Sequence, residues 1–225
     1  SPRSYWPDDE PIRLEIEGGA ISIIANPEVD NSSQKEMKIK ALSEDCIQVT
    51  HKIRNIGRWP IRLACWALSV MRKNGFAVIP LESSRVDERG LLPDRHFSIW
   101  PYDDLSDRRL RLTDRYVIVD QNPFFKNPFK IGGMSRQAWV AYCVDGIAFV
   151  KQFGVEEGEY PDFGCNVEVY TNADMLELET IGPLKLVEPS ESTEHAEYWS
   201  LFDTGQLTHE SKDIKERLEA LISRG

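Results

Sequence analysis

Short segments rich in Val, Ile, Phe, Tyr and Trp recur along almost the whole chain, separated by Gly, Pro, Asn and Asp. The first group favours β-strands and the second favours turns. Gly18-Gly19 and Asp145-Gly146 accept the positive φ angles of two-residue hairpin turns. We expect strands at 13–17, 20–24, 35–42, 47–55, 61–71, 76–80, 97–100, 116–120, 129–132, 138–144, 147–153, 166–171, 175–180 and 193–202. Such a pattern predicts an all-β fold of two packed antiparallel sheets, a β-sandwich or barrel.

In the last part of the chain the apolar residues recur with the spacing of a helix instead of a strand. In the segment 209–223 the apolar side chains form one helical stripe, and Thr208 is a suitable N-cap. The stripe consists of Ile214, Leu218, Leu221 and Ile222. We therefore expect one β-sandwich domain over residues 1–205 and a C-terminal helical tail over residues 206–225.

Charge and composition exclude several classes of partner. The chain has 27 Lys+Arg against 37 Asp+Glu, a net charge of −10, whereas nucleic acids and anionic membranes attract positive surfaces. No segment approaches the roughly 18 apolar residues that span a bilayer. We expect no nucleic-acid and no membrane partner. The sequence shows no signal peptide, which favours a cytoplasmic location, and it leaves the oligomeric state open.

Cysteine spacing and catalytic motifs give no sign of a metal or a cofactor. None of the four cysteines belongs to a C-x-x-C pair, and three lie in apolar strand-like runs, so we expect buried free thiols. The acidic residues between positions 103 and 114 lack the spacing of an EF-hand loop. Nucleophile-elbow, P-loop, H-E-x-x-H and dinucleotide-binding motifs are absent from the sequence.

A candidate site comes from the strand-like segments 166–171 and 175–180. Side chains alternate across a strand, so burying the Val and Leu residues of both segments places Glu168, Glu177 and Glu179 together on the other face, with Asn166 and Tyr170. Like charges on directly opposed residues destabilise a sheet. We therefore expect a cation, water or a ligand rich in hydroxyl groups beside them; the alternative is a solvated outer face.

Other residues can complete such a site. Lys151 and Lys130 each lie in or at the end of an apolar strand, where a lysine is either a surface residue or a partner of these carboxylates. Carboxylates, a lysine and aromatic rings are the groups that bind sugars. The available rings include Trp100, Tyr102, Tyr160 and Phe163.

The histidines differ in their surroundings. His96 follows Arg95 in the irregular segment 82–114, and a histidine there can act as a general acid or base near neutral pH. His51 and His195 lie in strand patterns that favour a structural role, and His209 lies where the expected helix begins.

The segment 49–71, VTHKIRNIGRWPIRLACWALSVM, resembles a bacterial protein family with a galactose mutarotase-like fold. Five further segments resemble the same family: LLPDR (91–95), WPYDDLSD (100–107), YPDFGCNVE (160–168), ELETIGPL (177–184) and PSES (189–192). The resemblance covers nearly the whole chain except the last helix. Members of the family have further strands before the position of Tyr5, so the chain resembles a form without its first part.

This resemblance implies a supersandwich of antiparallel strands whose concave face binds carbohydrate. The wider superfamily contains aldose 1-epimerases, in which histidines and a glutamate transfer protons between sugar anomers. This sequence differs from them at Trp66, which occupies the region where a catalytic histidine is expected.

Together these observations favour a carbohydrate-binding protein. We expect Glu168, Glu177 and Glu179 to accept hydrogen bonds from a sugar and Asn166 and Lys151 to donate them. Arg95 and His96 are expected to close the rim of the site. The alternatives are an aldose 1-epimerase or related isomerase, with His96 and Glu179 as the acid–base candidates, and a non-catalytic interaction module.

Overall fold

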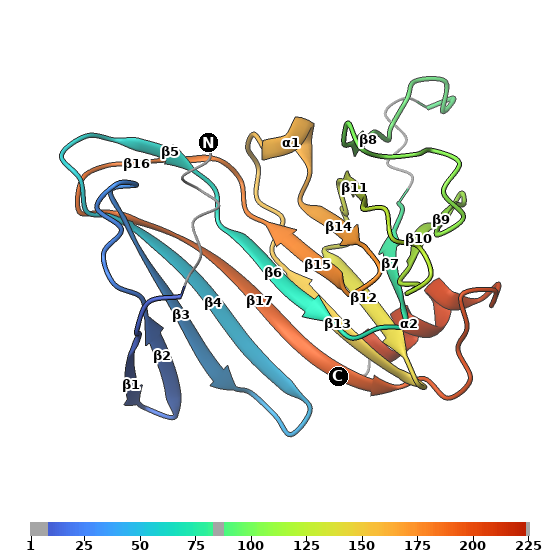
Figure 1. Ribbon diagram of the computed structural model, residues 1–225, viewed down its shortest axis with the longest axis horizontal. Helices are drawn as coiled ribbons and strands as arrows, with labels where there is room; N and C mark the ends of the chain where they lie inside the picture. The colour runs from blue at the N-terminus through green and yellow to red at the C-terminus, as the bar shows by residue number, and fades with distance from the viewer. Residues whose placement is uncertain (1–8, 83–87, 224–225) are drawn as a thin grey trace.

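The computed structural model describes residues 9–82 and 88–223 and contains one large and one smaller antiparallel sheet (Figure 1). The ten-stranded sheet contains, in spatial order, β1 (Arg13–Glu17), β2 (Ala20–Ile24), β3 (Ser33–Ala41), β4 (Cys46–Asn55), β17 (Ser192–Asp203), β13 (Ile147–Phe153), β12 (Trp139–Val144), β7 (Phe76–Pro80), β10 (Tyr116–Asp120) and β9 (Leu110–Leu112). The five-stranded sheet contains β6 (Trp66–Met71), β15 (Leu176–Ile181), β14 (Val167–Thr171), β11 (Phe129–Gly133) and β8 (Phe97–Ile99). β16 (Lys185–Val187) and β5 (Ile61–Leu63) form a separate pair.

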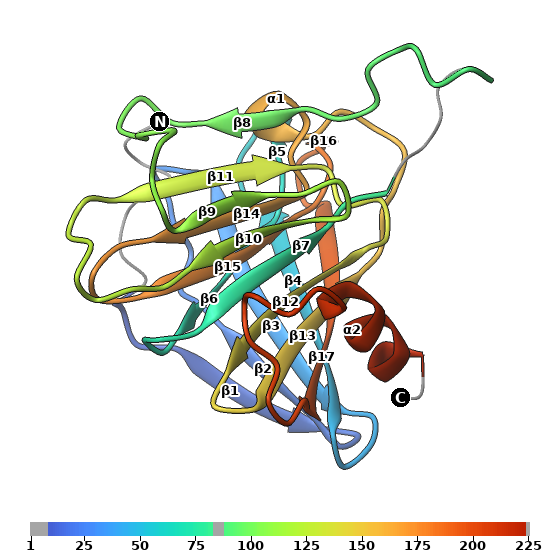
Figure 2. The ribbon, with the colours of Figure 1, turned by 90° about the vertical axis from the view of Figure 1, so that its right-hand side faces the viewer.

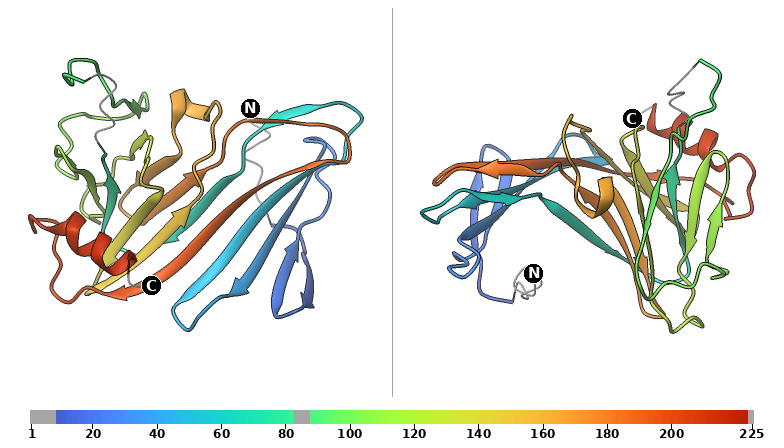
Figure 3. Two further views of the ribbon diagram at one scale, coloured as in Figure 1. Left: turned by 180° about the vertical axis from the view of Figure 1, so that it is seen from behind. Right: turned by 90° about the horizontal axis from the view of Figure 1, so that it is seen from above.

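The main hydrophobic core lies between the two sheets. The small sheet contributes apolar side chains such as Ile131, Val169 and Leu178, and the large sheet contributes others such as Val117 and Val140. Because side chains alternate along each strand, the remaining residues of β14 and β15 lie on the other face of the small sheet, which we call the outer face. The N-terminal strands of the large sheet, drawn in blue, extend beyond the small sheet (Figure 3, right).

A second core lies on the far side of the large sheet, under helix α2 (Ile214–Ile222). Ile214 and Leu218 of the helix are buried there with residues such as Val78 and Val150 (Figure 2). The expected helix over 209–223 is thus shorter than predicted. Hydrogen bonds between Thr208 and Ser211 close a turn before the helix begins.

Most strand predictions are confirmed, and one differs in an informative way. The segment 61–71 is not one strand: β5 pairs with β16, whereas β6 pairs with β15 in the small sheet. The break falls in an uninterrupted apolar run, so alternation gives no sign of it. Strands β9 and β16 were not expected from the pattern. Gly18-Gly19 and Asp145-Gly146 have the positive φ angles that their predicted hairpin turns require.

The cysteines are free, and Cys65, Cys143 and Cys165 are buried. Burial raises the pKa of the first two thiols to about 12 and that of Cys165 to about 11. Within the described ranges, no helix is long and apolar enough to cross a membrane.

Candidate functional site

The register of β14 and β15 brings the acidic residues together on the outer face. Glu168 lies directly opposite Glu179, and Tyr170 lies opposite Glu177. Glu168 and Glu179 are almost completely buried, with exposed fractions of 1% and 0%, and Glu177 is half-buried. Two opposed and buried carboxyl groups need a compensating partner, because burying unpaired charge is costly.

Lys130 of β11 is that partner. Its Nζ lies 2.6 Å from Glu168 Oε2 and 2.9 Å from Glu179 Oε2. The ammonium also lies 5.1 Å from the ring centre of Trp66 and 4.7 Å from that of Trp100, within the range of cation–π attraction. Trp66 Nε1 donates a 2.5 Å hydrogen bond to Glu179 Oε2. We call these five residues the carboxylate–lysine cluster.

Burial and charge shift the proton affinities in the carboxylate–lysine cluster. Burial raises the pKa of Glu168 to about 8, although the Lys130 ammonium opposes that rise. Burial by itself would lower the pKa of Lys130, but Glu179 and Glu168 outweigh it and raise that pKa overall. At neutral pH Lys130 is therefore charged, and the larger share of Glu168 is the neutral acid. Burial, with the charge of Glu179, also raises the pKa of Glu177.

The loop after β8 brings aromatic rings to the cluster. Asp103 fixes this loop, because its carboxylate accepts hydrogen bonds from the backbone N–H groups of Trp100 and Lys130, at 2.6 and 2.8 Å. Tyr102 lies in the same loop with 44% of its surface exposed, and burial of the rest raises its pKa to about 12. Trp66 remains 38% exposed. Two accessible rings thus flank a buried group of charges.

One oxygen of each buried carboxyl group has no hydrogen-bond partner in the described part of the chain. These atoms are Glu168 Oε1 and Glu179 Oε1. Buried polar atoms are normally hydrogen-bonded, to protein or to water, and unpaired ones call for an explanation. Glu179 Oε1 can therefore accept a hydrogen bond from a hydroxyl or amine, and Glu168 Oε1 can donate one in the neutral form of that acid.

The structure places Lys151 elsewhere. It lies on β13 in the space between the sheets, on the core side of the small sheet, and is completely buried. Its Nζ lies 2.6 Å from Glu197 Oε1 and donates to the carbonyls of Ala67 and Leu178, at 3.1 and 3.2 Å. Burial lowers the pKa of Lys151. The ammonium therefore ties the two sheets together, on the opposite face of the small sheet from the carboxyl groups of Glu168 and Glu179.

Glu197 is the centre of a second polar group that the sequence did not reveal. It accepts hydrogen bonds from His51 Nε2, Trp199 Nε1 and Thr180 Oγ1, at 2.9, 3.0 and 2.5 Å. Burial alone would raise its pKa, but the hydrogen bonds from His51 and Thr180 and the charge of Lys151 lower it to about 2. His195 Nε2 lies 2.8 Å from Thr180 Oγ1, and burial lowers the pKa of this histidine to about 4. The extensive internal bonding of Glu197 indicates a structural role.

Asn166 also has a structural environment. It is completely buried, and its amide accepts a hydrogen bond from the backbone N–H of Ser135 and donates one to the carbonyl of the same residue. Its polar atoms are therefore used in joining the start of β14 to the loop after β11.

Arg95 and His96 are exposed at the start of β8. Arg95 donates to the carbonyl of Asp114 and lies near Asp94. His96 lies beside Gly164 of the short helical turn α1 (Pro161–Gly164), which lies next to β8 (Figure 2). Neither forms a described contact with the carboxylate–lysine cluster.

Of the aromatic residues expected in the site, two lie beside the carboxylate–lysine cluster and two lie elsewhere. Trp100 and Tyr102 belong to the site. The Tyr160 hydroxyl bonds to the backbone of Glu156, and Phe163 projects from α1 with 94% exposed. Trp66 was not among the expected ligand-binding residues. Alternation along β6 places it on the same face as Leu68 and Val70, and β6 borders β15.

Comparison with known proteins shows the fold. No protein-family model and no curated protein sequence matches this chain. Among solved structures, Slr1438 from Synechocystis sp. PCC 6803 matches with a TM-score of 0.55 at 12% identity, over 87% of this chain and 66% of that one. A galactose mutarotase-like protein from Lactobacillus casei ATCC 334 matches with a TM-score of 0.54 at 9% identity, over 85% and 73%. The chain has the galactose mutarotase-like fold.

A further match shows the same architecture. A protein from Escherichia coli K12 with a provisional assignment as an aldose 1-epimerase matches with a TM-score of 0.53 at 11% identity, over 85% of this chain and 68% of that one. The present chain thus spans about two thirds of the length of these structures. At such identities the likeness concerns the arrangement of strands.

Proposed function

We propose that the protein binds a small carbohydrate on the outer face of the five-stranded sheet, at the carboxylate–lysine cluster. The observation that carries this proposal is the pair of buried, unpartnered oxygens, Glu168 Oε1 and Glu179 Oε1, beside two tryptophan rings. Sugar hydroxyls donate hydrogen bonds to carboxyl oxygens, and the apolar faces of pyranose rings stack on aromatic rings. The fold that the chain shares with galactose mutarotase-like proteins supports the same class of ligand.

Each group has a distinct part in this proposal. Trp66 and Tyr102 provide exposed ring surface for stacking, and half-buried Glu177 accepts hydrogen bonds at the margin. Glu179 accepts a hydrogen bond from a sugar hydroxyl, and Glu168, which is mostly the neutral acid at neutral pH, donates one from its Oε1. Lys130 holds both carboxyl groups in place, so it is a positioning residue rather than a direct donor.

The test is calorimetric titration of a panel of neutral aldoses into the wild-type protein and the Glu179→Gln variant. Losing a hydrogen bond to a charged group weakens binding by about tenfold or more. The matched control is Glu157→Gln at an exposed position, which should bind as the wild type does. Equal binding by wild type and Glu179→Gln, or no binding of any sugar in the panel, would contradict the proposal.

A second function, aldose 1-epimerase activity, is favoured by the proton affinity of Glu168. With its pKa raised to about 8, Glu168 is a proton donor at neutral pH, and Glu179 lies directly opposite as an acceptor. Anomer exchange requires one group that donates a proton and one that accepts it. Polarimetry on fresh aldose solutions tests this: Glu168→Gln and Glu179→Gln should each abolish any acceleration of mutarotation that the wild type shows.

A further inference from the structure

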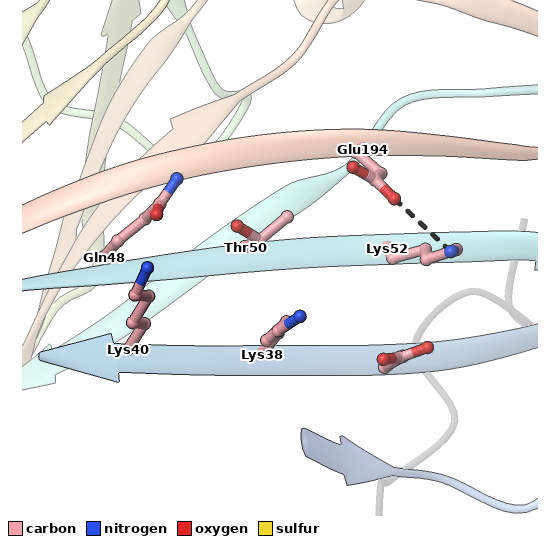
Figure 4. Close-up of a pocket in the computed structure, with 7 residues that line it drawn as sticks. Lys38, Lys40, Gln48, Thr50, Lys52 and Glu194 are labelled. Carbon is pink, nitrogen blue, oxygen red and sulfur yellow. Dashed lines mark ion pairs between the residues drawn. The ribbon is translucent and has the colours of Figure 1, made fainter. Parts of the chain in front are cut away.

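The face of the large sheet on which helix α2 packs also has an open hollow, whose lining differs from that of the carboxylate–lysine cluster. Helix α2 covers this face over β12 and β13, while over β3, β4 and β17 a hollow of about 390 Å³ lies open. The side chains that line it come from alternate positions of the three strands and project toward the same side (Figure 4). They are Glu36, Lys38, Lys40, Gln48, Thr50, Lys52 and Glu194.

The hollow is locally positive in a protein whose net charge is −10. Three lysines and two glutamates line it, and one of the lysines, Lys52, lies 3.4 Å from Glu194. Within residues 9–82 and 88–223, no carboxylate forms an ion pair with Lys38 or Lys40. The charges of these two lysines therefore remain available to an anion.

The sheet register fixes the spacing of the lysines. Lys38 lies opposite Thr50, and Lys40 lies opposite Gln48. Residues two apart on a strand are about 7 Å apart, and long lysine side chains can converge from that distance on neighbouring anionic groups. On β4, beside these lysines, the Thr50 hydroxyl and the Gln48 amide can donate further hydrogen bonds. This arrangement suits two linked anionic groups better than one.

We propose that this hollow binds a small molecule carrying a diphosphate group. Lys38 and Lys40 each neutralise one phosphate, and Thr50 and Gln48 donate hydrogen bonds to its oxygens. Glu36 and Glu194 lie in one row with Lys52 at one end of the hollow, so the unpaired positive charge is concentrated toward the other end, at Lys38 and Lys40. The site lies on a different layer from the carboxylate–lysine cluster and does not depend on the proposed sugar binding.

The test is isothermal titration of inorganic diphosphate and of ADP into the wild-type protein and the Lys38→Gln/Lys40→Gln double variant. We expect both ligands to bind the wild type and to bind the double variant about tenfold or more weakly, since each exposed ion pair contributes a modest part. Binding of ADP alone, weakened by the same variant, would support the site and assign its ligand as a nucleotide.

The control is Lys126→Gln/Lys212→Gln, which removes the same net charge from exposed positions outside the hollow. It should change the affinity by less than about twofold. Circular dichroism confirms that both double variants fold. The proposal is overturned if neither ligand binds the wild type, or if the two double variants weaken binding equally, because overall charge alone then explains the effect.

Discussion

Glu168 and Glu179 lie directly opposite each other in the β14–β15 ladder, both buried, with the Lys130 ammonium 2.6 and 2.9 Å from one oxygen of each. Opposed carboxylates destabilise a sheet, and buried ones destabilise it further. The arrangement persists because one cation serves both groups and because Glu168 holds its proton to a high pH. This dependence leads to the first two predictions.

Replacing Lys130 with methionine keeps most of the length of the side chain and removes its charge. Two buried carboxyl groups then lose their common partner, and we expect the free energy of unfolding to fall by about 3 kcal/mol or more. Urea denaturation followed by tryptophan fluorescence measures this change. Lys126→Met at an exposed position is the control and should change stability by less than about 0.5 kcal/mol. Similar values for the two variants would show that Lys130 has no special role.

Glu168 should make the protein less stable as the pH rises. Its pKa is about 8 in the folded state against 4.5 for an ordinary glutamate, so the folded protein binds this proton more tightly. The resulting stability is fully present below about pH 4.5 and is lost as the pH rises through about 8. In Glu168→Gln that loss should be smaller by about 5 kcal/mol, as measured by denaturation at several pH values. Parallel profiles for wild type and variant would exclude the raised pKa.

His195 should have the opposite effect in acid. Burial lowers its pKa from 6.5 to about 4, so the unfolded chain binds this proton more readily. The stability it contributes is present above about pH 6.5 and is lost as the pH falls through about 4. We expect a loss of about 3 kcal/mol over that interval and a smaller one in His195→Gln. Titration of the His195 ring by NMR provides a direct measurement, and a midpoint near 6.5 would contradict the prediction.

Gly132 is required by the close approach of β11 to β14. A Cβ atom at this position would lie 2.7 Å from Cys165 Sγ and 3.1 Å from Glu168 Cγ. We expect Gly132→Ala to destabilise the protein by about 2 kcal/mol in thermal denaturation. Adding Cys165→Ala should recover part of the loss, because the nearest clashing atom is then absent.

The control for this prediction is Gly154→Ala. No atom lies within 4 Å of a Cβ at Gly154, and its φ is not in the positive region. The substitution should therefore leave stability within about 0.5 kcal/mol of the wild type. A loss at Gly154 equal to that at Gly132 would mean that the clash is not the cause.

Local alternation was enough to predict the face on which the glutamates lie, because the Val and Leu residues of β14 and β15 can be buried in only one register. The same pattern could not identify the cation. Lys130 and Lys151 both follow apolar residues in strands, but only β11 is hydrogen-bonded to β14, whereas β13 belongs to the other sheet. The topology of the sheets decides which strands distant in the chain become neighbours. The alternation of apolar and polar residues along a single strand carries no information about it.

The polar group around Glu197 could not be predicted for the same reason. Glu197 meets His51 from the adjacent strand and Thr180 from the opposite sheet, so its partners are distant in the chain. The division of 61–71 into β5 and β6 was also hidden, since the residues at the break are as apolar as their neighbours. In contrast, the two-residue turns depend on local backbone preferences and were correctly predicted.

The coupling of Lys130 to both Glu168 and Glu179 constrains how this surface could change over generations. Any one of the three, exchanged alone, leaves the others mismatched in a water-poor environment. Related chains should therefore retain all three residues or replace all three, and chains that have exchanged only one or two of them should be rare. A designer wishing to retarget this face would have to exchange the three side chains in a single step.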